Sequence, residues 1–406
     1  MKCSRIDRLL MEQEHLSSLS RREIESLQLS RLNRLLQREK ERGGFYQALP
    51  ERIENIAGLS ELPFTTDEDL ARHAAFMLLT SQSRIQRVLS DATSGTTGTA
   101  KRVFYTERDI ENTVRLYVAG LGELVEPGSV TMICFPFSGP YGLGELIAEA
   151  IARLGARPLK LGSSLCYRDY AEVMRQERPD TFVGMPAQLL SIFRVCGCGS
   201  LKRALVSGDA CPEAVIHCCE ELLSSRLFPH YGSREMGMAG AITCQAHAGM
   251  HLRENHIIAE IVDEDGSVLP PGEYGELVIT TIGMEALPLI RYRTGDYTRI
   301  LPGACPCGSE VLRLDCVHRK GRDGEMAALD NELFGIPAVA DYRAAFIGEQ
   351  LNIEMRTVAS LSEEEVCACA SKVFPKTDIR VRLSPVLPEH TALYPGKRNC
   401  LHLPMP

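Results

Sequence analysis

A run of hydroxyl-bearing residues and glycines at positions 93–101 has the composition of a phosphate-binding loop. Gly95 and Gly98 permit positive φ angles, so successive backbone N–H groups can converge on one anion. Lys101 adds a mobile positive charge. The loop lacks the Walker A pattern, which needs a lysine directly after its last glycine. A polar surface loop is the alternative interpretation. The side-chain donors of the run are the hydroxyls of Thr93, Ser94, Thr96, Thr97 and Thr99.

Four shorter segments further along the chain could complete a nucleotide site. Residues 207–210 (Ser-Gly-Asp-Ala) follow an expected strand and could present backbone groups to a purine. Residues 230–235 (His-Tyr-Gly-Ser-Arg-Glu) offer an aromatic ring and a carboxylate suited to a metal ion. Residues 293–296 (Arg-Thr-Gly-Asp) place an acid on a tight turn, where it can accept hydrogen bonds from both ribose hydroxyls. Residues 321–323 (Gly-Arg-Asp) pair a flexible glycine with an arginine. Each segment alone has an ordinary structural explanation, so their order after the loop carries the signal.

Two pairs of soft or borderline ligands suggest a metal site. Cys305 and Cys307 form a tight C-x-C knuckle, and Cys244 and His251 precede it in the chain. Four such ligands fit a closed tetrahedral zinc site, with His247 as the alternative to His251. The chain has 15 cysteines, and in a reducing compartment the others are expected to be free thiols.

The combination of these motifs resembles one family. The phosphate loop, Y-G-S-x-E at 231–235, Y-R-T-G-D at 292–296 and G-R-D at 321–323 resemble the AMP-forming acyl-adenylate (acyl-CoA synthetase) superfamily. With L-P-F-T-T at 62–66, the chain is identified as a phenylacetate–CoA ligase-like member over nearly its whole length. The resemblance implies ATP-dependent activation of a carboxylic acid to an acyl-adenylate, with release of pyrophosphate and transfer of the acyl group to CoA.

The resemblance also implies a role for each matching position. Glu235 would bind Mg²⁺, Lys101 and Lys397 would be catalytic, and Asp323 would be an interdomain hinge. A lysine is needed because a carboxylate that attacks the α-phosphorus meets negative charge. The implied nucleotide contacts beyond the loop are Gly208, Asp209, Ala210, Tyr231, Gly232, Ser233, Asp296 and Arg322.

The acid-binding region is expected at residues 135–142 (Phe-Pro-Phe-Ser-Gly-Pro-Tyr-Gly). This segment follows an expected strand and is rich in aromatic residues and glycine, which suits a flat, apolar acid. Phe135, Tyr141 and Gly142 are the candidate contacts. The alternative is that Phe135 and Phe137 belong to the core.

Three functional alternatives stay open at this point. Family members usually have a glycine- and asparagine-containing loop just after the hinge, which joins the active site in the thioester step. The segment here, residues 324–331 (Gly-Glu-Met-Ala-Ala-Leu-Asp-Asn), lacks the glycine of that loop. Adenylation without CoA transfer is therefore the second interpretation. A non-catalytic adenylate-binding module is the third, but a binder has no need of Lys397. A phosphotransferase would require Walker or kinase motifs, which the sequence lacks.

The elements that must position these residues predict an α/β fold. Residues 1–42 read as helical, with a capping box at Ser20 and Glu23, and the charges between Arg31 and Lys40 read as a solvated face. Strands at 130–135, 181–184 and 203–207 alternate with helices at 144–154, 187–194 and 212–223, which favours mostly parallel strands. A hairpin from Ile257 with a turn at 263–266 begins a β subdomain.

The domain boundaries follow from that pattern. We expect an adenylation domain at 1–322, with a helical part at 1–90, and a small mobile α+β lid at 323–406. The net charge of −8 argues against nucleic acid as a partner. The start of the chain carries no apolar signal core, and no apolar run is long enough to span a bilayer. A cytoplasmic enzyme is therefore expected, and the family resemblance adds a possible homodimer.

Overall fold

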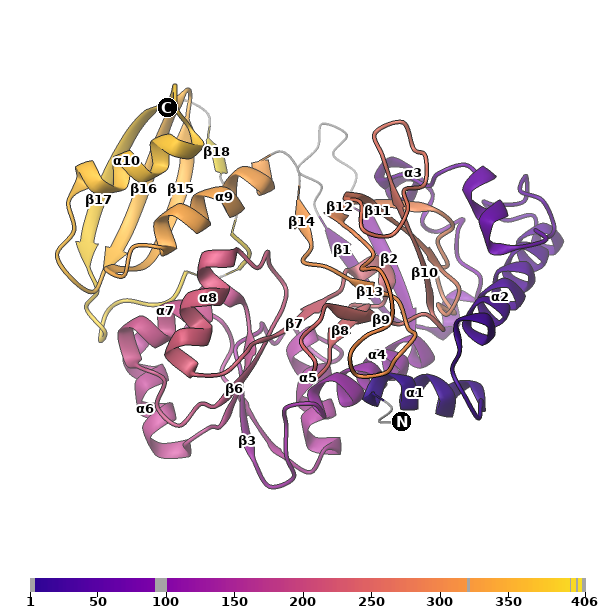
Figure 1. Cartoon of the computed structure of the whole chain (residues 1–406), viewed down its shortest axis with the longest axis horizontal. Helices are drawn as coiled ribbons and strands as arrows, with labels where there is room; N and C mark the ends of the chain where they lie inside the picture. The colour runs from indigo at the N-terminus through magenta and orange to yellow at the C-terminus, as the bar shows by residue number, and fades with distance from the viewer. Residues whose placement is uncertain (1–3, 92–100, 320–321, 395, 399–400, 404–406) are drawn as a thin grey trace. The chain divides into compact units, whose positions relative to one another are not determined.

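The computed structural model describes residues 4–91, 101–319, 322–394, 396–398 and 401–403, and it contains two compact units (Figure 1). The first unit combines Met1–Glu123 with His230–Val317, and the second combines Leu124–Pro229 with His318–Pro406. Each unit thus folds from two segments that lie far apart in the sequence. The domain division at residue 322 stays a prediction.

The long helix α2 shows how the first unit is assembled. It begins at the predicted capping box, in which the Ser20 backbone N–H donates to the Glu23 carboxylate over 2.8 Å, and it ends at Gly43 with φ 66°. Its apolar side packs on strand and loop residues that include Ile258 and Ile290. The prediction of a fully solvated charged face is wrong for Arg31, which is half-buried and pairs with Glu14 over 2.6 Å. The helices of the first unit are α1 (Arg5–Glu14), α2 (Arg21–Arg42), α3 (Asp67–His73) and α4 (Glu107–Leu121), with 3-10 turns at Ile56–Glu61, Gln82–Arg84 and Arg234–Met236.

Antiparallel pairing joins the strands of the first unit. β1 pairs with β2, β10 pairs with β11 and β11 with β12, and the ladder from β8 to β9 continues to β13. The predicted hairpin from Ile257 is confirmed, since Ile257 pairs with Thr281, but its connection is longer than the predicted turn because β11 begins only at Gly275. The strands are β1 (Ile85–Asp91), β2 (Lys101–Thr106), β8 (Ala241–Thr243), β9 (Met250–Leu252), β10 (Ile257–Val262), β11 (Gly275–Thr281), β12 (Tyr292–Thr298) and β13 (Arg313–Leu314).

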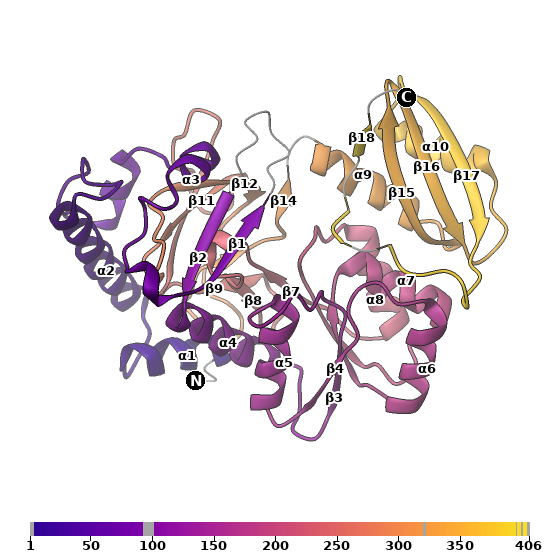
Figure 2. The ribbon, with the colours of Figure 1, turned by 180° about the vertical axis from the view of Figure 1, so that it is seen from behind.

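The second unit holds the predicted parallel sheet. Its strands pair in the order β4-β3-β5-β6, and β6 pairs with the first residues of β7 (Phe228–Tyr231). Helix α5 covers one face, and α6, α7 and α8 cover the other (Figures 1 and 2). The strands are β3 (Val130–Ile133), β4 (Arg157–Lys160), β5 (Thr181–Gly184) and β6 (Arg203–Val206). The helices are α5 (Leu143–Arg153), α6 (Tyr167–Glu177), α7 (Pro186–Cys196) and α8 (Glu213–Leu223).

The C-terminal part of the second unit has the predicted α+β composition. Its sheet runs β17-β16-β15-β18, and α9 and α10 cover one face (Figures 1 and 2). Leu329 and Met355 of this part share a buried cluster with Phe193 of α7, so the two halves of the unit have a common core. The elements are α9 (Arg322–Phe334), β15 (Val339–Ile347), β16 (Gln350–Thr357), α10 (Glu363–Val373), β17 (Asp378–Pro385) and β18 (Leu401–Leu403), preceded by the short β14 (His318–Arg319).

Within the described ranges, no helix has both the length and the apolar character needed to cross a bilayer.

The first unit buries three histidines, His230, His251 and His256. Burial lowers the pKa of His230 to about 3, and its ring packs on Tyr117 with the centroids 5.1 Å apart. The folded state therefore holds these rings neutral.

Acid should destabilise the first unit through these rings, and His230→Phe tests this. An unfolded histidine has a pKa of about 6.5, so below that pH the side chain is protonated in the unfolded chain but stays neutral in the folded protein. The free energy of unfolding therefore falls as the pH is lowered. Phenylalanine keeps a ring but removes the titration. The loss of unfolding free energy between pH 7 and pH 5 should shrink by about 2 kcal/mol.

Urea titrations across this pH range measure the effect, and His73→Phe is the control because that side chain is exposed. An unchanged pH dependence in His230→Phe would contradict the assignment of acid sensitivity to the buried ring.

Candidate functional site

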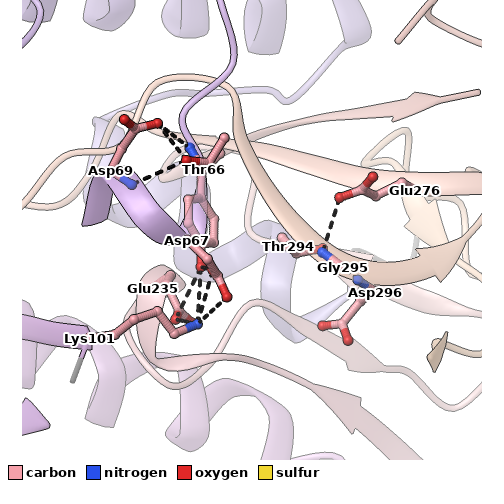
Figure 3. A network of polar contacts seen from close by, with 10 residues as sticks. Thr66, Asp67, Asp69, Lys101, Glu235, Glu276, Thr294, Gly295 and Asp296 are labelled. Carbon is pink, nitrogen blue, oxygen red and sulfur yellow. Dashed lines mark hydrogen bonds and ion pairs between the residues drawn. The ribbon is translucent and has the colours of Figure 1, made fainter. Parts of the chain in front are cut away.

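Lys101 lies at the centre of a charged cluster in the first unit (Figure 3). Its Nζ lies 3.1 Å from both carboxylate oxygens of Asp67 and 3.2 Å from Oε1 of Glu235. The Tyr292 hydroxyl lies 3.3 Å from the same nitrogen and donates to Asp67. One ammonium thus neutralises two carboxylates from separate segments.

Four different elements bring these side chains together. Lys101 is the first residue of β2, and Tyr292 is the first residue of β12. Asp67 opens α3, whose start is fixed by a capping box between Thr66 and Asp69. Glu235 lies in the 3-10 turn Arg234–Met236. Thr66 is the N-cap of α3, and this cap fixes the direction in which Asp67 enters the cluster.

Helix α4 holds the backbone around Glu235 in place. The Thr113 hydroxyl donates to the Gly237 carbonyl over 2.6 Å, and the Tyr117 hydroxyl donates to the Met238 carbonyl over 3.1 Å. Gly232 must be glycine at this point, because a Cβ there would lie 2.6 Å from the Met238 carbonyl oxygen. The turn that carries Glu235 is therefore fixed from both sides.

Charge pairing keeps Glu235 ionised although it is 9% exposed. Burial alone would raise the pKa of its carboxyl, but the Lys101 ammonium and hydrogen bonds outweigh burial and hold that pKa below its usual value. For Lys101, burial is likewise outweighed by Glu235 and Asp67, and its pKa is raised. Both groups are charged at neutral pH, so a buried carboxylate is available to a cation.

A second acid lies on the predicted turn of the first unit. The buried Asp296 accepts a hydrogen bond from the Tyr231 hydroxyl over 2.7 Å. Glu276 fixes the turn by accepting from the Gly295 backbone N–H over 3.1 Å. The Thr294 hydroxyl also accepts from the Asp296 backbone N–H over 3.1 Å. The structure therefore brings two predicted nucleotide contacts, Tyr231 and Asp296, into direct contact.

In the second unit, the predicted acid- and purine-binding segments meet at Phe135. Gly208 has φ 84°, and a Cβ there would lie 2.9 Å from the Phe135 ring. Phe135 is 2% exposed, which supports the core alternative for its ring, whereas Tyr141 is 38% exposed with φ 65°. Gly142 is the N-cap of α5 and leaves no room for a side chain beside Ser138. Of the three candidate contacts, Tyr141 is thus the exposed one.

The C-terminal segment of the second unit binds Asp209. The Arg398 backbone N–H donates to the Asp209 carboxylate over 2.7 Å. The Arg398 guanidinium reaches Asp330 over 2.8 Å and Asp341 over 3.1 Å. Burial raises the pKa of Asp330 to about 6 in spite of this partner. Lys397, which precedes Arg398, is exposed, so its neighbour is anchored while its own side chain reaches solvent.

The four predicted metal ligands lie together in the first unit. The ligand atoms of Cys244, His251, Cys305 and Cys307 are all within 4.8 Å of one another. Sγ of Cys244 lies 3.8 Å from Sγ of Cys305, and Sγ of Cys307 lies 3.6 Å from Nε2 of His251. Burial lowers the pKa of His251 to about 4, so its ring is neutral, as a ligand must be. His251 rather than His247 occupies this cluster.

Residues 93–99 of the expected phosphate loop lie outside the described residues, as do the side chains of Arg322 and Asp323. Their roles stay predictions. Residues 324–331, where the family's glycine was missing, belong to helix α9.

Sequence reasoning missed Asp67 and Tyr292. The only signals were local: Asp67 follows two threonines at a helix start, and Tyr292 begins the Y-R-T-G-D motif. Neither pattern predicts a contact with Lys101, which is 34 residues from Asp67 in the sequence.

Comparison with known proteins assigns the family. A family model described as AMP-binding enzyme matches residues 92–285. Phenylacetate–coenzyme A ligases from Thermus thermophilus and Escherichia coli are 31% and 30% identical to the chain, in alignments that cover 75% of this chain and 72% of each relative. The chain belongs to the phenylacetate–CoA ligase family. This confirms the resemblance drawn from the motifs.

A solved structure of a 2-hydroxyisobutyryl-CoA ligase, in the postadenylation state with 2-HIB-AMP, has a similar fold to this family member. Its TM-score is 0.75 at 18% identity, over 93% of this chain and 89% of that chain. The same ligase with R3-HIB-AMP gives a TM-score of 0.74 at 19% identity. The α/β architecture is therefore the fold of adenylate-forming ligases.

Arg398→Met should destabilise the second unit strongly. It leaves Asp330 and Asp341 buried without their cation, and breaking a buried ion pair typically costs about 3–5 kcal/mol. The pKa of Asp330 is already raised and should rise further, so the folded variant binds a proton that the unfolded chain does not. Its free energy of unfolding should therefore recover as the pH falls from 7 toward 5.

Urea unfolding at both pH values measures this recovery. Arg343→Met is the matched control, because Arg343 is exposed and lies over the ring of Tyr394. A loss in Arg398→Met no larger than in the control would show that the buried network contributes little.

Proposed function

We propose that this ligase couples a carboxylic acid to CoA in two steps. ATP first activates the acid to an acyl-adenylate with release of pyrophosphate, and the thiol of CoA then displaces AMP. The chain is an AMP-forming acid–CoA ligase, as its relationship to the phenylacetate–CoA ligases indicates. The observation that carries the proposal is the joining of Lys101 to Glu235, because it unites the end of the phosphate-loop motif with the acid of Y-G-S-x-E.

The described side chains suit the first step. Glu235 and Asp67 offer carboxylate oxygens, the ligand type that Mg²⁺ prefers, and we assign the ion to this pair. When bound, Mg²⁺ would neutralise charge on the phosphates. Lys101 would then direct its ammonium to a phosphate oxygen. Asp296 would accept from the ribose hydroxyls, and Tyr231, which already donates to Asp296, would orient that carboxylate.

Lys397 is proposed to serve adenylation alone. It is exposed, while its neighbour Arg398 is anchored to Asp209. A lysine that bridges the acid and the α-phosphate stabilises charge only while phosphorus is attacked, so it accelerates that step and not the thioester step.

An aryl or small acyl acid is the proposed substrate. Tyr141 is exposed on the segment that carries Phe135, and Gly208 leaves room for the Phe135 ring. A homodimer and a cytoplasmic location stay predictions from the sequence and the resemblance.

Lys397→Ala, compared with wild type, tests both the overall reaction and the assignment of Lys397 to the adenylation step alone. Wild type with ATP, Mg²⁺ and a panel of aryl and short acyl acids should release AMP and pyrophosphate, and with CoA it should form a thioester. The variant should form adenylate on the order of a hundredfold more slowly. It should still transfer the acyl group from preformed acyl-adenylate to CoA.

Lys376→Ala, at another exposed lysine, is the control and should keep both rates. Release of ADP with every accepted acid would overturn the proposed function. Equal loss of both half-reactions would refute only the role given to Lys397.

We also propose a structural zinc ion at Cys244, His251, Cys305 and Cys307. Tetrahedral Zn–S bonds of about 2.3 Å place two sulfurs about 3.8 Å apart, and the observed separation of Cys244 and Cys305 is 3.8 Å. Four protein ligands leave no position for a reacting water, so the role is structural. The ion would tie β9, which carries His251, to the segment after β12.

Metal analysis should therefore find one zinc per chain in protein purified without added metal. Cys305→Ser should lose the metal and lower the melting temperature, since metal binding is coupled to folding. Cys369→Ser, a partly buried thiol of α10, is the control. A metal-free wild type that melts like Cys305→Ser would show that these four residues form no zinc site and are ordinary buried side chains.

A further inference from the structure

A cavity in the first unit lies beside helices α1, α2 and α4 and beside the segment that follows β11. Its volume is about 370 Å³, within the range of small-molecule sites. Its lining includes residues of all four segments, and none of the residues discussed as nucleotide or zinc contacts belongs to it. The cavity is therefore separate from the groups assigned to the ligase reaction.

The walls of this cavity are strongly basic. Five arginines line it, against three glutamates, which gives 5 − 3 = +2 with histidine neutral. The whole chain, by contrast, carries a net charge of −8. The arginines are Arg31, Arg34, Arg38, Arg108 and Arg115, and the glutamates are Glu14, Glu111 and Glu285.

Three of these arginines are placed at a cost to the fold. Arg34 and Arg38 are four residues apart on α2, where like charges repel. Arg108 lies in the first turn of α4, where the helix dipole disfavours a cation. Among the residues that the structure describes, none of the three forms an ion pair, whereas Arg31 pairs with Glu14. All three side chains are exposed, and the carboxylates that share the cavity wall with them are Glu14, Glu111 and Glu285.

The positive potential reaches the groups behind the wall. Burial lowers the pKa of Arg31, and the charges of Arg34 and Arg108 lower it further, in spite of Glu14. Burial, with Arg253 and Arg31 adding to it, also lowers the pKa of His256 well below its usual value. An anion in the cavity would relieve this repulsion.

The inner wall is also closely fitted. A Cβ at Gly283 would lie 2.1 Å from Nδ1 of His256, so only glycine lets the chain pass over that ring. Behind it, a small hollow of about 10 Å³ shares His256 with the main cavity and is lined by Arg253. Arg253 is 3% exposed, and its Nε has no hydrogen-bond partner within the described part of the chain. Its other contacts are with Gln13 Oε1 and His256 Nε2, so one buried donor of this cation is left without a partner beside the hollow.

We propose that this cavity binds a small phosphorylated metabolite, with Arg34, Arg38 and Arg108 holding the phosphate dianion. Arginine suits this role because its planar fork matches phosphate oxygens in pairs. The volume leaves space beyond the phosphate for an organic part. The site is additional to the ATP, acid and CoA sites of the ligase reaction, and binding there does not depend on turnover.

Calorimetric titration of the full chain tests the site. The probes are glycerol 3-phosphate and inorganic phosphate, each against sodium chloride of matched ionic strength. Arg34→Gln/Arg108→Gln removes two of the proposed contacts. Because two charge-assisted contacts are lost, the dissociation constant should rise by about a hundredfold.

Arg8→Gln/Arg22→Gln is the matched control, since both arginines are exposed on α1 and α2 of the same unit and neither lines the cavity. It should bind as wild type does, and both double variants should keep wild-type ligase activity. Binding of glycerol 3-phosphate lost only in Arg34→Gln/Arg108→Gln supports an organic phosphate. If wild type binds inorganic phosphate but not glycerol 3-phosphate, and Arg34→Gln/Arg108→Gln loses that binding, the ligand is free phosphate and the organic part of the proposal is wrong. Equal affinity in both double variants, or no binding of either probe to wild type, would overturn the proposal.

Discussion

The need to neutralise a buried carboxylate organises the first unit. Glu235 is nearly buried, and an isolated carboxylate there would take up a proton. The ammonium of Lys101 prevents this, and it can do so only because β2 begins where α3 brings Asp67 and β12 brings Tyr292. Three segments from distant parts of the chain must therefore be in register before the turn with Glu235 is stable. Lys101 and Glu235 are both ionised in this pair, so either group can take a charged ligand without first gaining or losing a proton.

The second unit repeats this arrangement, in which one cation pairs with two carboxylates. A single cation, Arg398, is enclosed by Asp330, Asp341 and the ring of Tyr342. Here the burial of the carboxylates is only partly offset, as the raised pKa of Asp330 shows. The C-terminal segment is thus held by electrostatics as well as by packing. The backbone N–H of the same arginine caps Asp209, so the position of Lys397 depends on this network.

Features set by local pattern could be predicted from the sequence, and features set by long-range assembly could not. The capping box at Ser20 and the strand at 181–184 depend on neighbouring residues, and both are confirmed. The grouping of His251 with the cysteines was also predicted, because soft ligands at close spacing have few other roles. By contrast, the contact of Asp67 with Lys101 depends on the docking of α3, which no short pattern encodes.

The same distinction explains one refinement and one error. The predicted turn at 263–266 forms, and Val262 bridges Val268 across it, but the long partner strand of β10 is β11, which begins at Gly275. Arg31 was assigned to a solvated face because helix α2 is highly charged, yet a carboxylate of α1 covers it. Charge pattern identifies a polar face, but it does not say what packs against that face.

Helix α4 contributes to two separate features of the first unit, the turn that carries Glu235 and the basic cavity. Its buried hydroxyls at Thr113 and Tyr117 hold the carbonyls behind Glu235, and its first turn carries Arg108 at the basic cavity. A substitution that shifts this helix along its axis would move both surfaces together, since both belong to one rigid element. Divergence of the ligase would then be constrained here more tightly than burial alone suggests. The loop around Tyr141 is exposed and lies in the other unit, so substitutions there leave α4 unchanged.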